Sequence, residues 1–322
     1  MFRHTIAAAL MLFAWSTGHT QAPAYPVQPV KLVVGFAAGG PTDIVARKFA
    51  EHAARAFGQP VLVENRPGAN SILAADAVAA ARPDGHTLLI GATNHAMTPA
   101  LYADRIKFDA VKSFRPVCIL AASPTVLVTG PRMRAATLAE FTGLLRAKPG
   151  AYTYASTGVG SSVHLATEMF GKLTGTTMIH VPYKGAAPAA ADLLGGQVDF
   201  YFATAGSVLP HIKSGKLTAL AVTGAQRPAM LPAVPTFEEA GVKGFALDAW
   251  YGVLAPAGIP APVAAALEKT ARDFVQAPAI RERLLAAGLE AQTTCGDAFA
   301  AQLTREVGLY TQVVRDLKLK LE

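Results

Sequence analysis

This 322-residue sequence lacks the common patterns of metal and nucleotide sites. Its eight histidines include no pair with HxxxH or HExxH spacing, and two cysteines are too few for a zinc cluster. GxxxxGK[ST] is absent, and the glycines after the first predicted strand do not fit GxGxxG. The 29 lysines and arginines form no run and do not alternate with aromatic residues. We therefore expect no metal, no cofactor and no nucleic-acid partner.

Cysteine is scarce, with only Cys118 and Cys295 present. The two residues can pair if the protein matures in an oxidising compartment. Cys118 also lies in an apolar run typical of a strand, where a buried free thiol is equally ordinary. The sequence leaves both states open.

The N-terminus has the composition of a secretory signal peptide over residues 1–24. A short basic start precedes the apolar run Thr5–Trp15, which is well below the ~20 residues needed to span a bilayer. Small residues follow, with cleavage expected near Ala22–Ala24. No later apolar run reaches spanning length, so we expect an exported, soluble protein. Because Arg3 is lost with the leader, the net charge falls from +7 to +6.

The segment Lys31–Arg47 has the order of a buried strand, a glycine-rich turn and a helix start. The first amides of a helix have no acceptor within the helix, and the helix dipole adds partial positive charge there. Glycines let a ligand approach that backbone closely, so the segment is suited to bind an anion. Asp43, at the start of the helix, is interpreted as a cap that accepts amide hydrogen bonds.

A second segment of this kind is Ser156–His164, again between a predicted strand and a predicted helix. Two such loops, one in each α/β series, fit a carboxylate held between two lobes. Ser161 and His164 are three residues apart, which leaves an exported serine hydrolase as the enzymatic alternative. No GxSxG motif surrounds this serine, so we do not expect an enzyme or a catalytic residue.

Strands and helices alternate twice along the chain, which predicts an α/β fold of two lobes, each a mainly parallel sheet flanked by helices. We expect residues 25–124 and 247–322 to form one lobe and residues 125–246 the other. Hinges are expected near Ser123–Pro124 and around Gly244–Trp250. Asn94 and His95 follow a predicted strand at the edge where ligands gather in open α/β sheets, so they either line a pocket or cap the next segment.

Seven ordered motifs resemble one protein family, the Bug family of periplasmic solute-binding proteins, which are the TctC-like receptors of tripartite tricarboxylate transporters. Each motif alone is weak evidence, but the ordered set is specific and the resemblance covers nearly the whole mature chain. The motifs are Val34–Arg47, Glu64–Ala69, Pro83–Gly85, Ser156–Ser161, Val181–Gly185, Leu209–Ile212 and Trp250–Gly252.

The resemblance implies a periplasmic, monomeric receptor with a Venus-flytrap fold that closes over a small organic carboxylate. It implies that backbone amides and hydroxyls of the two loops hold the carboxylate, and that the partners are transporter subunits or a sensor kinase. The ligand-binding residues that the resemblance implies are Phe36, Ala37, Ala38, Gly39, Gly40, Thr42, Ser156, Thr157, Gly160, Ser161, Ala203 and Thr204. The position after the third predicted strand adds Asn94 and His95 to the predicted ligand-binding residues.

Two positions depart from the family pattern. Many members resemble Phe-Asp-Asn where this chain has Phe202–Gly206, so an acidic partner for an amino group is missing. We therefore expect a mono- or dicarboxylate in place of an amino acid. The loop Ala69–Ile72 also departs, because further glycines are usual there. It is expected to alter one wall of the pocket.

Overall fold

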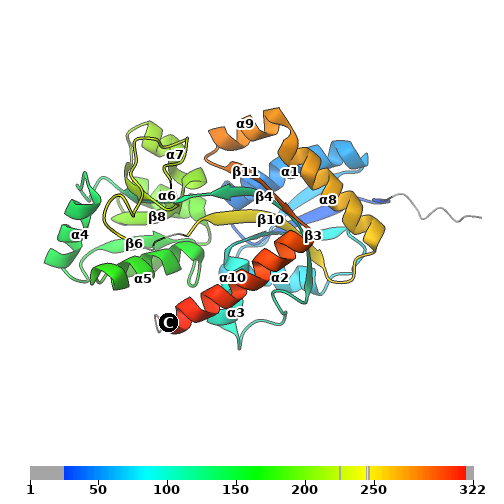
Figure 1. The fold of residues 1–322 in the computed structure, drawn as a ribbon, viewed down its shortest axis with the longest axis horizontal. Coiled ribbons are helices and arrows are strands. Elements are labelled where there is room, and N and C mark those ends of the chain that lie inside the picture. The colour runs from blue at the N-terminus through cyan, green and yellow to red at the C-terminus, as the bar shows by residue number, and fades with distance from the viewer. Residues whose placement is uncertain (1–24, 225, 244, 246, 317–322) are drawn as a thin grey trace, which may run out of the picture.

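A computed structural model describes residues 25–316 apart from 225, 244 and 246. They form two β-sheets covered by helices, which lie side by side along the long axis of the molecule (Figure 1). We call the first sheet with its helices lobe 1 and the second sheet with its helices lobe 2. The predicted signal peptide and cleavage site lie outside the described residues. Within the described part of the chain, no helix is both long and apolar enough to cross a bilayer.

Lobe 1 contains a six-stranded sheet with the order β11-β4-β10-β3-β1-β2. Its strands are β1 (Val30–Val34), β2 (Val61–Asn65), β3 (Thr87–Ala92), β4 (Phe114–Ser123), β10 (Ala249–Pro256) and β11 (Glu290–Cys295). Its helices are α1 (Pro41–Phe57), the short η1 (Ala69–Ser71), α2 (Ile72–Ala79), α3 (Asn94–Tyr102), α8 (Ala261–Gln276), α9 (Pro278–Ala286) and α10 (Asp297–Asp316).

Lobe 2 contains a five-stranded sheet with the order β7-β6-β8-β5-β9. Its strands are β5 (Thr125–Thr129), β6 (Thr153–Ser156), β7 (Ile179–Pro182), β8 (Phe200–Thr204) and β9 (Thr218–Val222). Its helices are α4 (Leu138–Ala147), α5 (Ser162–Thr174), α6 (Ala186–Leu194) and α7 (Ala205–Lys213).

The two-lobed α/β fold of mainly parallel sheets agrees with the prediction. Among the described strands, β10 and β11 in lobe 1 and β5 in lobe 2 run against the others of their sheet. Pairing is parallel from β1 to β2 and β3, and from β6 to β7 and β8. Pairing is antiparallel where β10 meets β3 and β4, where β11 meets β4, and where β5 meets β8 and β9. The reason is that β4 carries the chain toward lobe 2 and β10 brings it back beside β4, so these neighbours run in opposite directions (Figure 1).

The local sequence explains the strand–turn–helix unit at the start of lobe 1. Leu32, Val33 and Val34 of β1 are at most 1% exposed, as expected for a strand covered on both faces. Pro41 occupies the first turn of α1, where a missing N–H costs nothing, and Gly58 ends the helix with a left-handed φ of 64°. This unit therefore places the start of α1 at the carboxyl end of β1.

The chain crosses from lobe 1 to lobe 2 between Ser123, the last residue of β4, and Thr125, the first of β5. The Ser123 hydroxyl donates to the Gly288 carbonyl at 3.0 Å and accepts from the Gly206 amide at 3.1 Å. The Thr125 hydroxyl donates to the Leu247 carbonyl at 2.7 Å. Side-chain hydroxyls thus join the outgoing connection to segments of both lobes.

Cys118 and Cys295 form a disulfide between the neighbouring strands β4 and β11. The sequence left the state of these cysteines open. Both belong to lobe 1, although 177 positions separate them along the chain. The bond therefore fastens the C-terminal part of the chain to the strand that leaves for lobe 2.

Candidate functional site

Five helices begin at one cavity between the lobes, which has a volume of about 40 Å³. They are α1 and α3 of lobe 1 and α5, α6 and α7 of lobe 2. Residues at or next to the first position of each helix line the cavity, with strand-end and loop residues between them. The lining consists of Phe36, Gly40, Pro41, Thr42, Ala92, Thr93, Asn94, Thr157, Ser162, Val163, Ala186, Thr204, Ala249 and Tyr251.

The electrostatics of this cavity come from the backbone. Each helix start presents N–H groups that lack intrahelical acceptors, together with roughly half a positive charge from the dipole. The lining contributed by the described residues includes no Asp, Glu, Lys, Arg or His. Its ionisable side chain is Tyr251, whose pKa is raised by burial, so its hydroxyl stays protonated at neutral pH. The cavity is thus neutral in formal charge but positive in potential, and its hydroxyls can donate hydrogen bonds.

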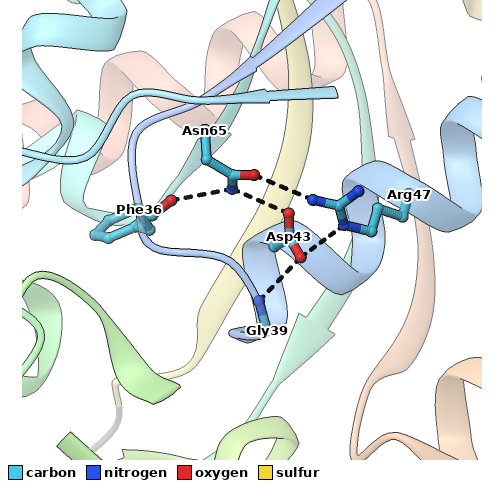
Figure 2. Close-up of polar contacts among 5 residues, drawn as sticks. All are labelled: Phe36, Gly39, Asp43, Arg47 and Asn65. Atoms are coloured by element: carbon cyan, nitrogen blue, oxygen red, sulfur yellow. Dashed lines mark hydrogen bonds and ion pairs between the residues drawn. The ribbon is translucent and has the colours of Figure 1, made fainter. Parts of the chain in front are cut away.

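A buried network around Asp43 fixes the turn that leads into α1 (Figure 2). Asp43 Oδ2 accepts from the Gly39 amide and from Arg47 Nε, both at 2.9 Å. Asn65 Nδ2 donates to Asp43 Oδ1 at 3.0 Å and to the Phe36 carbonyl at 3.1 Å. Burial raises the pKa of Asp43, but the hydrogen bonds from Arg47, Gly39 and Asn65 outweigh it and hold the pKa below its usual value.

The role predicted for Asp43 is confirmed in part. It accepts an amide hydrogen bond at the helix start, but the donor is Gly39 in the preceding turn and not an amide of α1. The partly exposed Arg47 guanidinium balances its charge. Asp43 therefore holds the turn without repelling an anion at the start of α1.

The loop before α5 is held by its own side chains. Ser161 is the N-cap of α5, and its hydroxyl accepts from the His164 amide at 3.3 Å. His164 Nδ1 accepts from the Gly160 amide at 2.9 Å, and burial lowers the pKa of this ring to about 4, which keeps it neutral. Ser156 Oγ lies 2.6 Å from His180 Nε2. The serine hydrolase alternative is therefore wrong, because the Ser161 hydroxyl binds the His164 amide and the His164 ring binds the Gly160 amide, so the two side chains do not pair.

Six of the fourteen predicted ligand residues line the cavity. They come from both lobes and from four of the five helix starts or the segments before them. They are Phe36, Gly40, Thr42, Asn94, Thr157 and Thr204.

The other predicted residues lie outside the cavity wall for identifiable reasons. The Ala37 amide donates to the Lys184 carbonyl of lobe 2, so it is not free for a ligand. Ala38 and Gly39 lie in the exposed part of the turn, and Ala203 is fully buried in β8. In the second loop, the residues that stabilise the backbone instead of facing the cavity are Ser156, Gly160 and Ser161.

His95 was predicted to line the ligand site, but the structure places it in the core of lobe 1. It is 3% exposed, stacks on Phe108 with ring centroids 5.6 Å apart, and meets the edge of Phe114. Its Nε2 lies 2.9 Å from the Ala110 carbonyl, and burial lowers its pKa to about 4. The first turn of α3 directs Asn94 to the cavity and His95 into the core.

Sequence reasoning missed the other cavity residues. Ser162 and Val163 start α5, and Ala186 starts α6 directly after Gly185. The motif Val181–Gly185 is itself a strand followed by a glycine and a helix, so its pattern was available as a signal. Tyr251 lies in the motif Trp250–Gly252, to which the sequence alone assigned no chemical role. The remaining missed residues are Pro41, Ala92, Thr93 and Ala249.

The lobes touch each other around the cavity. The Ala37 amide donates to the Lys184 carbonyl at 3.0 Å, and Asn70 Nδ2 donates to the Gly160 carbonyl at 2.9 Å. The Tyr102 hydroxyl donates to the Val159 carbonyl. A second cavity of about 250 Å³ adjoins the first and shares Phe36 and Thr157 with it. Its other lining residues are Gly35, Gly68, Ala69, Asn70, Tyr102, Gly158, Val159, Pro182, Tyr183 and Lys184.

Two α/β lobes that meet around a cavity lined by helix N-termini define a solute-binding protein of the periplasmic type. The model of the tripartite tricarboxylate transporter family receptors, TctC, matches residues 45–316, and the chain belongs to this family. It is thus a receptor and not an enzyme.

Relatives and solved structures agree with this family. Protein BugT of Bordetella pertussis is 34% identical over 302 residues, which are 94% of this chain and 93% of that protein. A structure of an R. palustris protein with adipate has a TM-score of 0.88 and 31% identity, covering 92% of this chain and 99% of that one. MatC from Rhodopseudomonas palustris with bound malate has a TM-score of 0.86 and 33% identity, covering 90% and 100%.

Proposed function

We propose that this protein captures a small organic carboxylate between its lobes and delivers it to a tripartite tricarboxylate-type transporter. The observation that supports this most strongly is the convergence of five helix N-termini on a cavity without charged side chains. Such termini bind anions through free amides and the helix dipole. Both lobes supply such helix N-termini, so the bound anion contacts both lobes.

The chemistry of the lining favours a carboxylate over a more highly charged anion. Arg and Lys, which commonly balance phosphate, are absent from the described lining, whereas Thr42, Thr157, Ser162 and Thr204 offer hydroxyls. A carboxylate has one charge and acceptor capacity at each oxygen, which matches a cluster of single N–H and O–H donors. The adipate and malate complexes of the two R. palustris proteins support the same ligand class.

The lobe boundaries, the hinges, the export and the oligomeric state in this proposal are taken from the sequence. Residues 25–124 and 247–322 form one lobe and residues 125–246 the other, with hinges near Ser123–Pro124 and around Gly244–Trp250. Residues 1–24 form a leader that directs the protein to the periplasm, where it acts as a monomer. The family supports a transporter as the partner in preference to a sensor. Loss of uptake of the labelled ligand in a strain without this protein tests that choice.

Binding is tested by titration calorimetry on protein that has been unfolded, dialysed and refolded to remove retained ligand. The panel contains mono-, di- and tricarboxylates together with phosphate and amino acids. We expect at least one carboxylate to bind with micromolar or tighter affinity. Absence of binding by every carboxylate, or tighter binding of phosphate, contradicts the proposal.

A matched pair of variants links binding to this cavity. Thr157→Val removes a cavity hydroxyl and keeps the shape of the side chain, and we expect about fivefold to tenfold weaker carboxylate binding. Thr142→Val removes a buried hydroxyl on α4 that donates to the Leu138 carbonyl, and neither residue lines the cavity. This control is expected to bind normally. If both substitutions weaken carboxylate binding equally, the carboxylate binds outside this cavity.

A further inference from the structure

Two buried asparagines at the wall between the two cavities each leave one side-chain oxygen without a donor among the described residues. Asn94 is 4% exposed and lines the first cavity, and Asn70 is 8% exposed and lines the second. Asn94 Nδ2 donates to the Asn70 carbonyl at 2.7 Å, and Asn70 Nδ2 donates to the Gly160 carbonyl at 2.9 Å. The unpaired atoms are Oδ1 of both residues.

The orientation of these amides is fixed by their partners. Each Nδ2 faces a backbone carbonyl, which can only accept, so turning either amide would set two acceptors against each other. The free group at both positions is therefore an acceptor. A buried acceptor without a donor is costly, and native proteins rarely leave one unpaired.

The backbone around Asn70 is strained, which points to a functional reason for its position. Ala69, Asn70 and Ser71 have φ values of 45°, 52° and 73°, in the left-handed region that non-glycine residues rarely adopt. Strain of this kind persists where the surrounding structure imposes it, and it concentrates at ligand sites. Gly35 allows the close approach, because a Cβ at that position would lie 1.8 Å from the Ser71 hydroxyl oxygen. The loop thus holds the Asn70 carbonyl where it orients Asn94.

We infer that Asn94 Oδ1 accepts a hydrogen bond from a hydroxyl on the ligand, so that this receptor prefers hydroxy acids to the corresponding unsubstituted carboxylates. This inference rests on the proposed function and names a narrower ligand class for the same cavity. Asn94 is the first residue of α3, next to the helix starts that bind the carboxylate, so the hydroxyl lies close to that carboxylate. A 2-hydroxy acid has this arrangement.

A hydroxyl suits the site better than an ammonium group. An ammonium next to the helix N-termini would meet their partial positive charge. The described lining includes no carboxylate that could balance the charge of an ammonium group. Asp43 lies outside this lining and is already bound to Gly39, Arg47 and Asn65. A neutral O–H donor satisfies Asn94 without either cost.

The test compares ligands that differ by one hydroxyl, using ligand-free protein and calorimetry. The pairs are L-malate or D-malate against succinate, and lactate against propionate. We expect the hydroxy acid of at least one pair to bind about tenfold more tightly, as one added hydrogen bond to a buried acceptor allows. In Asn94→Ala this ratio falls to within about twofold of unity, mainly because the hydroxy acid binds more weakly.

The control is Thr98→Val, which removes a buried hydroxyl one turn further along α3 that donates to the Asn94 carbonyl. It is expected to keep the tenfold ratio. Wild-type protein that binds both members of every pair equally overturns the inference and leaves carboxylate binding intact, whereas binding of no carboxylate refutes the proposed function itself. The wild-type ratios decide the matter even if Asn94→Ala does not fold.

Discussion

Replacing Asp43 with asparagine tests whether its buried network holds the first loop in place. The substitution keeps the shape of the side chain and removes its charge. Asp43 receives donors on both oxygens, from Gly39 and Arg47 on one and from Asn65 on the other. An amide in this position must turn its NH₂ toward one of these donors, so at least one buried hydrogen bond is lost in either orientation.

The structure gives the size of the expected effect. Hydrogen bonds to a charged group contribute about 1.5–3 kcal/mol each, and the Asp43 side chain is only 4% exposed. Loss of one or two such bonds lowers the free energy of unfolding by about 2–4 kcal/mol. For a protein of this size that corresponds to a fall in Tm of roughly 4–8 °C, measured by scanning calorimetry. Carboxylate affinity falls with it, because the turn before α1 is no longer held.

A control on the same helix separates this network from an ordinary ion pair. Glu51 pairs with Arg55 at the same i,i+4 spacing, but both side chains are more than half exposed. Glu51→Gln is expected to leave the Tm nearly unchanged, because exposed ion pairs contribute little to stability. If Asp43→Asn and Glu51→Gln have the same Tm, the reasoning is refuted.

The pH dependence gives an independent check. Because the pKa of Asp43 is lower in the folded protein than in the unfolded chain, its stabilising contribution is present above the unfolded value. The contribution is lost as the pH falls through the folded value. The stability difference between wild type and Asp43→Asn should therefore shrink below about pH 4.

Three further predictions follow from other parts of the structure. Gly160→Ala is expected to weaken carboxylate binding at least tenfold by calorimetry, since Gly160 has a φ of 71° and a Cβ there would lie 2.8 Å from the Tyr102 ring. A carboxylate affinity equal to that of the wild type would contradict a role in binding for this contact between the lobes. Reducing the Cys118–Cys295 disulfide is expected to lower stability by up to about 5 kcal/mol in the chain-entropy model, visible as a lower urea midpoint, and an unchanged midpoint would argue against it. His95 has a folded pKa of about 4, below its ordinary value near 6.5, so the unfolded chain binds more protons between these values. Stability should therefore fall from pH 7 to pH 5, with a share of about 2 kcal/mol from His95 beside the contributions of His164 and His180, so the fall should be smaller by about that share in His95→Gln.

The two-lobed fold was predictable because it depends on local patterns. Glycine-rich turns between apolar runs and amphipathic stretches identify β1 with α1 and β6 with α5 without any tertiary information. The direction of pairing was not predictable. It depends on β10 returning between β3 and β4, and nothing in residues 249–256 specifies those neighbours.

The candidate site was predictable as a pair of helix starts but not in detail. Which amides remain free depends on distant partners, such as Lys184 for Ala37, and neighbouring sequence does not reveal them. His95 was placed wrongly for a similar reason. Its environment comes from Phe108 and Phe114, on a segment that the sequence does not tie to α3.

The order of strands in lobe 1 determines the order in which the protein can be built. Strand β10 lies between β3 and β4, so the first sheet is incomplete until residues 249–256 have been synthesised. All five strands of lobe 2 precede them in the chain. As the chain is made from its N-terminus, lobe 2 can therefore fold while lobe 1 still lacks its central strand. Oxidation of Cys118 waits longer still, because its partner Cys295 is made after β10.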